Sequence, residues 1–216
     1  DPIRLAEDVA WADQISRGRV IVGLARGVFP RWDNVLGQHY RTQPGVLGPE
    51  AERHNREVFE ELFQVIKLSW ADEPFSFKGK YYQVPYPAEG LEWKPKEATT
   101  RYGAPGELDE TGWLRRISPV PKPYQKPHPP VFQALTMTEE TIRWAAREGV
   151  IPIIFLPFPD MAIKGAQFYT DEATKAGRSL QLGQSVGLCR LMYLGDSYQE
   201  AMERARKAFD NKGLKL

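Results

Sequence analysis

The sequence predicts an α/β protein with a parallel sheet, and two features of the chain indicate this class. From residue 130 onward, short apolar runs alternate with amphipathic helical segments, as in parallel sheets whose strands are joined by helices. Residues 20–24 form a mostly β-branched apolar run that follows a polar turn and is bounded by glycines, which is typical of a strand buried on both faces. About four parallel strands can be counted, whereas a closed (β/α)8 barrel needs eight in about 250 residues. The residues alone therefore leave open a small doubly wound sheet and an incomplete barrel.

The composition excludes several classes of function. The 216 residues are 42% hydrophobic, enough for a sizeable core, and their 29 basic and 28 acidic residues form no basic stripe that would bind nucleic acid or a membrane surface. No apolar run approaches the roughly 20 residues of a membrane helix, and no signal peptide is expected. Cys189 is the only cysteine, which excludes an intrachain disulfide and fits a cytoplasmic location. His39, His54 and His128 lack metal-site spacing, so we expect no metal.

The first part of the chain is expected to hold two helices around one strand. Residues 1–15 predict a helix without an N-cap, whose apolar stripe is Leu5, Val9, Ala12 and Ile15. A strand over 19–24 and a polar loop over 29–48 follow. The next helix runs to about Trp70, with a core-facing stripe of Val58, Phe59, Leu62, Phe63, Val65 and Ile66. Residues 75–84 alternate aromatic and polar side chains around a Lys-Gly pair, which predicts a hairpin.

The rest of the chain begins with an irregular, proline-rich segment over about 85–130. A long loop inside a compact domain is usually functional or mobile, and a partly ordered surface excursion is the alternative. Beyond it, glycine and capping signals place three strands and three helices. The strands are expected over 131–135, 151–156 and 185–194, and the helices over 138–148, 160–176 and 197–209, the last capped by Asp196.

Arg26 follows the first strand directly, at the end of a strand where α/β proteins gather ligands. Gly23 and Gly27 on either side allow a close approach of the backbone, and a guanidinium makes strong contacts with anions. Arg26 is therefore a candidate anion clamp. The alternative is a solvated loop arginine.

Thr138 and Thr141 form a second candidate, at the next strand-to-helix junction. Thr138 suits an N-cap, and its hydroxyl, that of Thr141 and the exposed helix amides would suit a phosphate. Ordinary helix capping is the commoner explanation of such a pair, and Glu139 and Glu140 would repel a phosphate if they turned inward. Because consecutive parallel strands are neighbours, Arg26 and Thr138 are expected at one rim, within reach of one phosphate.

The chain resembles the bacterial luciferase-like, flavin-dependent monooxygenase family. The resemblance rests on motifs whose order and spacing match almost the whole chain: Pro-x-Arg-Leu-Ala-Glu at 2–7, Asp-x-x-Ser-x-Gly-Arg at 13–19, Gly-Leu-Ala-Arg-Gly at 23–27, Gln-Lys-Pro-His-Pro-Pro at 125–130 and Thr-Glu-Glu-Thr-Ile-Arg-Trp-Ala-Ala at 138–146. It implies a (β/α)8 TIM barrel that is incomplete here, with about strands 4 to 7 in one partial domain over residues 1–216. The uncovered strand edge at 20–24 would favour a homo- or hetero-oligomer, such as a dimer.

The resemblance also implies a site for reduced FMN at the carboxyl rim of the barrel. The flavin phosphate would be held by Arg26, Arg56, the Met137 amide, Thr138 and Thr141, and Arg56 and Met137 enter through the resemblance alone. Ala25 stands where the catalytic luciferase subunit has a cysteine near the flavin, which weakens any expectation of light emission. No catalytic acid or base is assigned.

The implied activity is a flavin-dependent monooxygenation that belongs chemically to the cofactor. Reduced FMN, supplied by a flavin reductase, would take up dioxygen and oxygenate a small organic substrate. A relative in the same barrel family that uses F420 for hydride transfer is the nearest alternative. A non-catalytic flavin-binding or partner subunit and a fragment that binds nothing are the others.

Overall fold

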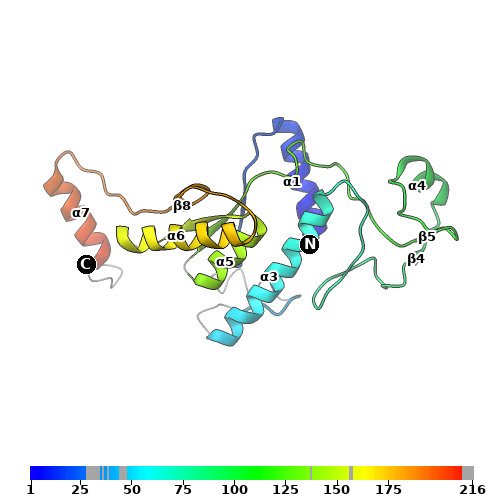
Figure 1. The fold of residues 1–216 in the computed structure, drawn as a ribbon, viewed down its shortest axis with the longest axis horizontal. Coiled ribbons are helices and arrows are strands. Elements are labelled where there is room, and N and C mark those ends of the chain that lie inside the picture. The colour runs from blue at the N-terminus through cyan, green and yellow to red at the C-terminus, as the bar shows by residue number, and fades with distance from the viewer. Residues whose placement is uncertain are drawn as a thin grey trace. The chain divides into compact units, whose positions relative to one another are not determined.

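A computed structural model describes most of the chain and divides it into two compact units, Asp1–Val131 and Phe132–Leu216 (Figure 1). The described residues are 1–27, 35, 37, 39–43, 48–136, 138–155 and 158–210. Most of the loop expected over 29–48, and the end of the strand expected over 151–156, lie outside these residues. No helix in the described ranges combines the length and apolar character that a membrane crossing requires.

Helix α1 (Pro2–Ser16) opens the first unit, close to its expected bounds. The Asp1 carboxylate accepts hydrogen bonds from the backbone N–H groups of Ile3 and Arg4, at 2.9 and 3.0 Å. The expectation of a helix without an N-cap was therefore wrong, because the first residue itself satisfies two otherwise unpaired amides.

The buried face of α1 is also not the one expected from its large apolar residues. Ala6 and Ala10 are fully buried, whereas Leu5 is 41% and Ile15 78% exposed. Helix α1 packs beside α3 (Pro49–Trp70) (Figure 1). The Trp70 indole N–H donates to the Ala6 carbonyl over 3.1 Å, so the two helices are joined by a hydrogen bond as well as by close contact.

Helix α3 matches its expected bounds and most of its expected stripe. Val58, Phe63, Val65 and Ile66 are buried, and Phe59 and Leu62 are half-buried. Pro49 occupies the first helical position, where its missing N–H costs nothing. This long helix is the scaffold of the first unit, because both α1 and the following hairpin attach to it.

The hairpin expected over 75–84 is confirmed: β2 (Phe77–Lys78) pairs antiparallel with β3 (Gln83–Val84). The Glu61 carboxylate on α3 holds its turn, since it accepts hydrogen bonds from the backbone N–H groups of Lys80, Tyr81 and Tyr82, at 2.9, 2.7 and 2.7 Å. The carboxylate approaches Gly79 so closely that a side chain at that position would collide with it. A larger residue there would have to displace the Glu61 carboxylate, which is held by three amides of the turn.

We expect Glu61→Ala to loosen this hairpin. Three turn amides would lose their acceptor and exchange it for water, so the free energy of unfolding should fall by about 1 kcal/mol. Hydrogen exchange at the amides of Tyr81 and Tyr82 should accelerate. Gln64→Ala, an exposed change one turn further along α3, is the matched control. Unchanged exchange at both amides would show that Glu61 does not hold the turn.

The segment over 85–130 is more ordered than the sequence suggests. It contains helix α4 (Lys96–Tyr102) and the antiparallel pair β4 (Leu91–Glu92) and β5 (Trp113–Leu114). Asp109 organises the turn before β5, where hydrogen bonds from Thr111, Arg115 and the Trp113 amide hold the pKa of its carboxyl well below the ordinary value. Whether this segment is functional or a surface excursion stays a prediction.

The second unit contains a parallel sheet, as expected. Strand β6 (Val131–Thr136) pairs in parallel with β7 (Ile151–Ile154), and β7 pairs in parallel with β8 (Gly187–Leu188). Helices α5 (Glu139–Glu148) and α6 (Pro159–Lys175) connect these strands and lie side by side (Figure 1). The α/β class with strands joined by helices is thus confirmed.

Three expected elements required correction. The strand expected over 185–194 shrinks to β8, and Ser185 before it has a positive φ of 56°, outside the extended region. In the first unit, β1 (Val22–Leu24) is shorter than the expected 19–24 and is not buried on both faces, since Ile21 beside it is 65% exposed. Helix α7 (Tyr198–Asp210) is capped by the Ser197 hydroxyl, which accepts from the Glu200 amide, and not by Asp196.

Candidate functional site

Arg26 and Arg56 converge on one carboxylate in the first unit. Arg26 follows β1, and its Nη1 lies 2.5 Å from Oε1 of Glu52 in the first turn of α3. Arg56 lies one helical turn after Glu52, and its Nη2 is 3.4 Å from the same oxygen. Two guanidinium groups from segments far apart in the sequence thus share a single anionic atom.

This arginine pair is shielded from solvent, and one of its donors is unsatisfied. The side chains of Arg26, Arg56 and Glu52 are 18%, 25% and 34% exposed. Nε of Arg56 is buried and has no hydrogen-bond partner in the described structure. Because a buried donor without an acceptor costs free energy, Nε of Arg56 would be stabilised by a further acceptor.

Thr138 and Thr141 lie together at the start of α5, as the sequence predicts. Thr138 is the N-cap residue, its Oγ1 is 2.8 Å from Oγ1 of Thr141, and it accepts from the Thr141 amide at 3.4 Å. Thr138 is exposed, whereas Thr141 is 4% exposed. The pair therefore caps the helix and also presents a hydroxyl at the positive end of its dipole.

Of the remaining residues expected at the site, the structure describes only Ala25. Ala25 lies exposed directly after β1, and Met137 lies outside the described residues. Arg26 and Arg56 belong to the first unit, Thr138 and Thr141 to the second. The expectation that both pairs meet one phosphate stays a prediction.

Sequence reasoning missed Glu52, the residue that joins the two arginines. Its signal was local: Glu52 precedes Arg56 by four residues on one face of α3, a spacing that favours an ion pair. The third participant, Arg26, is 26 residues away in sequence. Only the fold reveals that contact.

A second polar cluster on α3 has a structural role. The Tyr81 hydroxyl donates to Glu57 at 2.9 Å and lies 3.3 Å from Nδ1 of His54, while Lys80 donates to Glu57 at 2.8 Å. These contacts lower the pKa of the Glu57 carboxyl and raise that of the Lys80 ammonium. They fasten the hairpin to α3. Within the described ranges, no three His, Cys, Asp or Glu side chains are grouped so as to hold a metal ion.

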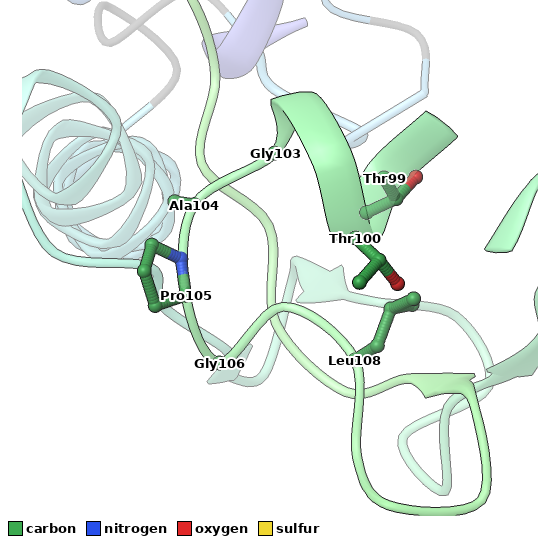
Figure 2. Close-up of a pocket in the computed structure, with 7 residues that line it drawn as sticks. All are labelled: Thr99, Thr100, Gly103, Ala104, Pro105, Gly106 and Leu108. Atoms are coloured by element: carbon green, nitrogen blue, oxygen red, sulfur yellow. The ribbon is translucent and has the colours of Figure 1, made fainter. Parts of the chain in front are cut away.

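A hollow of about 220 Å³ lies beside α4 in the 85–130 segment, and Figure 2 shows the residues that line it. They are small or apolar apart from two threonines: Thr99, Thr100, Gly103, Ala104, Pro105, Gly106 and Leu108. None of these side chains is titratable. The hollow therefore has no acidic, basic or charged side chain that could take part in catalysis or bind an anion, whereas the Arg26–Glu52–Arg56 cluster has three charged side chains.

A family comparison decides what kind of protein carries this cluster. Residues 1–213 match the luciferase-like monooxygenase family. The chain belongs to that family. The match spans nearly the whole sequence, so it covers both arginines of the first unit and both threonines of the second.

Individual relatives give the same result. The chain is 34% identical over 90 residues to 3,6-diketocamphane 1,6-monooxygenase of Pseudomonas putida, covering 41% of this chain and 24% of that protein. It is 25% identical over 207 residues to 2,5-diketocamphane 1,2-monooxygenase 1 of the same organism, covering 95% and 49%. The chain thus spans at most about half the length of these curated relatives.

A solved structure shares the fold. The oxygenating constituent of 3,6-diketocamphane monooxygenase from Pseudomonas putida, a type II Baeyer-Villiger monooxygenase solved in complex with FMN, aligns with a TM-score of 0.64 at 19% identity. The alignment covers 98% of this chain and 51% of that one. At this identity, the likeness establishes the architecture alone.

Proposed function

We propose that this chain is the flavin-binding part of a monooxygenase that uses reduced FMN and dioxygen to oxygenate a small organic substrate. The observation that carries the proposal is the convergence of Arg26 and Arg56 on one carboxylate oxygen. Guanidinium groups arranged around one anionic atom are the arrangement that recognises phosphate. Family membership and a structural relative solved with FMN support the choice of this phosphate ester.

The residues present fit the phosphate end of FMN. Arg26 and Arg56 supply charge, and the buried Nε of Arg56 supplies a donor that has no partner in the described structure. The Thr138 hydroxyl and the amide end of α5 would supply further donors, and the resemblance adds the Met137 amide. Bound FMN supplies the redox and oxygen chemistry. The chain's own groups would anchor and orient it through the phosphate, with Ala25 beside the flavin.

The architecture and partners of the whole protein are part of the same proposal. We infer a (β/α)8 barrel in which the described parallel strands form one arc, because the structural relative superimposes over nearly all of this chain while being about twice as long. A flavin reductase would deliver the reduced cofactor, since that relative is named as the oxygenating constituent of its system. The proposal also includes that the whole protein is cytoplasmic and forms a homo- or hetero-oligomer.

Ligand choice tests the function. FMN, riboflavin and F420 are titrated against the full-length protein, and we expect FMN to bind more tightly than riboflavin by at least tenfold, because only FMN carries the phosphate. With a flavin reductase, NADH and a panel of small ketones and aldehydes, oxygen consumption should then depend on the substrate. Tighter binding of F420 than of FMN would instead indicate the hydride-transfer relative. Failure to bind any of the three would contradict a flavin site.

A further inference from the structure

We propose that Glu52 is a built-in competitor of the flavin phosphate, which occupies the arginine pair in the absence of cofactor and sets the affinity for phosphorylated flavin. This inference rests on the proposed function. It goes beyond that function by assigning a specificity-determining role to a residue outside the expected phosphate-binding set.

The geometry places the Glu52 carboxylate where an anion would bind. Its Oε1 is the shared acceptor of Arg26 at 2.5 Å and of Arg56 at 3.4 Å. A carboxylate and a phosphate present similar anionic oxygens to a guanidinium, so each can substitute for the other. A phosphate that takes both arginines must therefore displace Glu52 or share them with it.

Burial indicates that Glu52 leaves one donor of Arg56 unsatisfied. Nε of Arg56 stays buried without a hydrogen-bond partner in the described structure, so Glu52 does not satisfy every donor of that guanidinium. A phosphate would bring more negative charge and three acceptor oxygens. Phosphate should therefore win the competition, at a cost equal to releasing Glu52.

Glu52 is also able to move away once displaced. It lies in the first turn of α3, where a negative side chain is favoured by the helix dipole wherever it points, and its side chain is 34% exposed. Rotation toward solvent would leave the carboxylate hydrated. The two arginines would meanwhile keep their positions, because Arg26 extends from β1 and Arg56 from α3.

The test compares Glu52→Gln with a matched control, Glu50→Gln. Glu50 lies two residues earlier in the same helical turn, its side chain is 93% exposed, and its ion pair in the described structure is with Arg53 at 4.0 Å. Both variants remove one negative charge from the start of α3, so they differ in contact with Arg26 and Arg56. The full-length protein is titrated with FMN and riboflavin, and binding is followed by flavin fluorescence. The measurement gives the affinity of each variant for each flavin relative to the unmodified protein.

We expect Glu52→Gln to tighten FMN binding by roughly tenfold relative to Glu50→Gln, with riboflavin unchanged by either. Inorganic phosphate should compete with FMN at a correspondingly lower concentration in the Glu52→Gln protein. Glu52→Ala, with thermal melting to verify folding, should act in the same direction. Weaker FMN binding in both Glu52 variants would mean that Glu52 orients the arginines. Equal FMN affinities in Glu52→Gln and Glu50→Gln would mean that only the loss of one negative charge matters. Either result would overturn the inference.

The same measurements separate this inference from the proposed function. If the unmodified protein prefers FMN over riboflavin but Glu52→Gln does not increase the preference, the competitor role alone is wrong. If the unmodified protein shows no preference between the two flavins, the phosphate site is wrong and the competitor role falls with it.

Discussion

Replacing Arg26 with alanine is expected to weaken FMN binding by about 10- to 150-fold. The change removes a charge-assisted contact to phosphate, and hydrogen bonds to charged groups contribute about 1.5–3 kcal/mol. It also releases Glu52, which is 2.5 Å from Arg26 and would then be left with Arg56. Riboflavin, which has no phosphate, should bind almost equally to both proteins. The measurement is a fluorescence titration of each flavin against each protein.

Arg53→Ala is the matched control for this experiment. Arg53 lies on α3 between Glu52 and Arg56, but its side chain is 69% exposed and its ion pair in the described structure is with Glu50. Loss of one positive charge at the surface should leave both titrations within about twofold, since exposed charges are screened by water and salt. Equal losses of FMN and riboflavin affinity in Arg26→Ala would show that Arg26 shapes the pocket in general, and the phosphate assignment would be withdrawn.

Replacing Asp13 with alanine is expected to lower the free energy of unfolding by about 2–4 kcal/mol. Asp13 is fully buried at the end of α1, and its two carboxylate oxygens accept from the backbone amide and the side-chain amide of Gln125, both at 2.8 Å. The alanine variant leaves the Gln125 backbone amide without an acceptor, which costs about 1–3 kcal/mol, and removes one of the two hydrogen bonds of its side-chain amide, worth about 1 kcal/mol. Urea denaturation followed by circular dichroism gives the difference.

Asp8→Ala provides the comparison for Asp13→Ala, because Asp8 is exposed on the same helix. Its effect should stay within about 0.5 kcal/mol, as for most surface substitutions. A similar small loss for Asp13→Ala would show that water replaces the buried acceptor.

The Asp13 variant should also bind FMN less well. Gln125 donates to the Val20 carbonyl just before β1, so a displaced Gln125 would disturb the strand that positions Arg26.

The elements of this chain were predictable where the signal is local. Helices α3, α5 and α6, the hairpin and the parallel strands β6 and β7 follow from periodicity, glycine stops and capping threonines within a few residues. The length of strand β8 was overestimated, because an apolar run over 185–194 does not tell how many of its residues pair with a neighbouring strand. The face of α1 was misjudged because large apolar side chains were expected to point inward, whereas close helix packing selected alanines.

The candidate site was predictable residue by residue but not as an arrangement. Arg26 and the Thr138–Thr141 pair can be found from their positions at strand ends and helix starts, and Arg56 from the resemblance of the chain to its family. Glu52 could not be found, because its role depends on a contact with Arg26 that only the fold creates. Similarly, Asp13 and Gln125 belong to two separate motifs, and the hydrogen bonds between them give a physical reason for both.

The alanine face of α1 imposes a constraint on volume that hydrophobicity scales do not capture. Ala6 and Ala10 are fully buried on a helix that packs against α3, so a larger side chain at either position, even a valine, would have to be accommodated by moving its neighbours. At Leu5 and Ile15, which are exposed here, side-chain size is far less restricted within this unit. Substitutions along α1 should therefore be tolerated least at its small alanines. The apolar pattern of the sequence would instead suggest that its large apolar residues are the least replaceable.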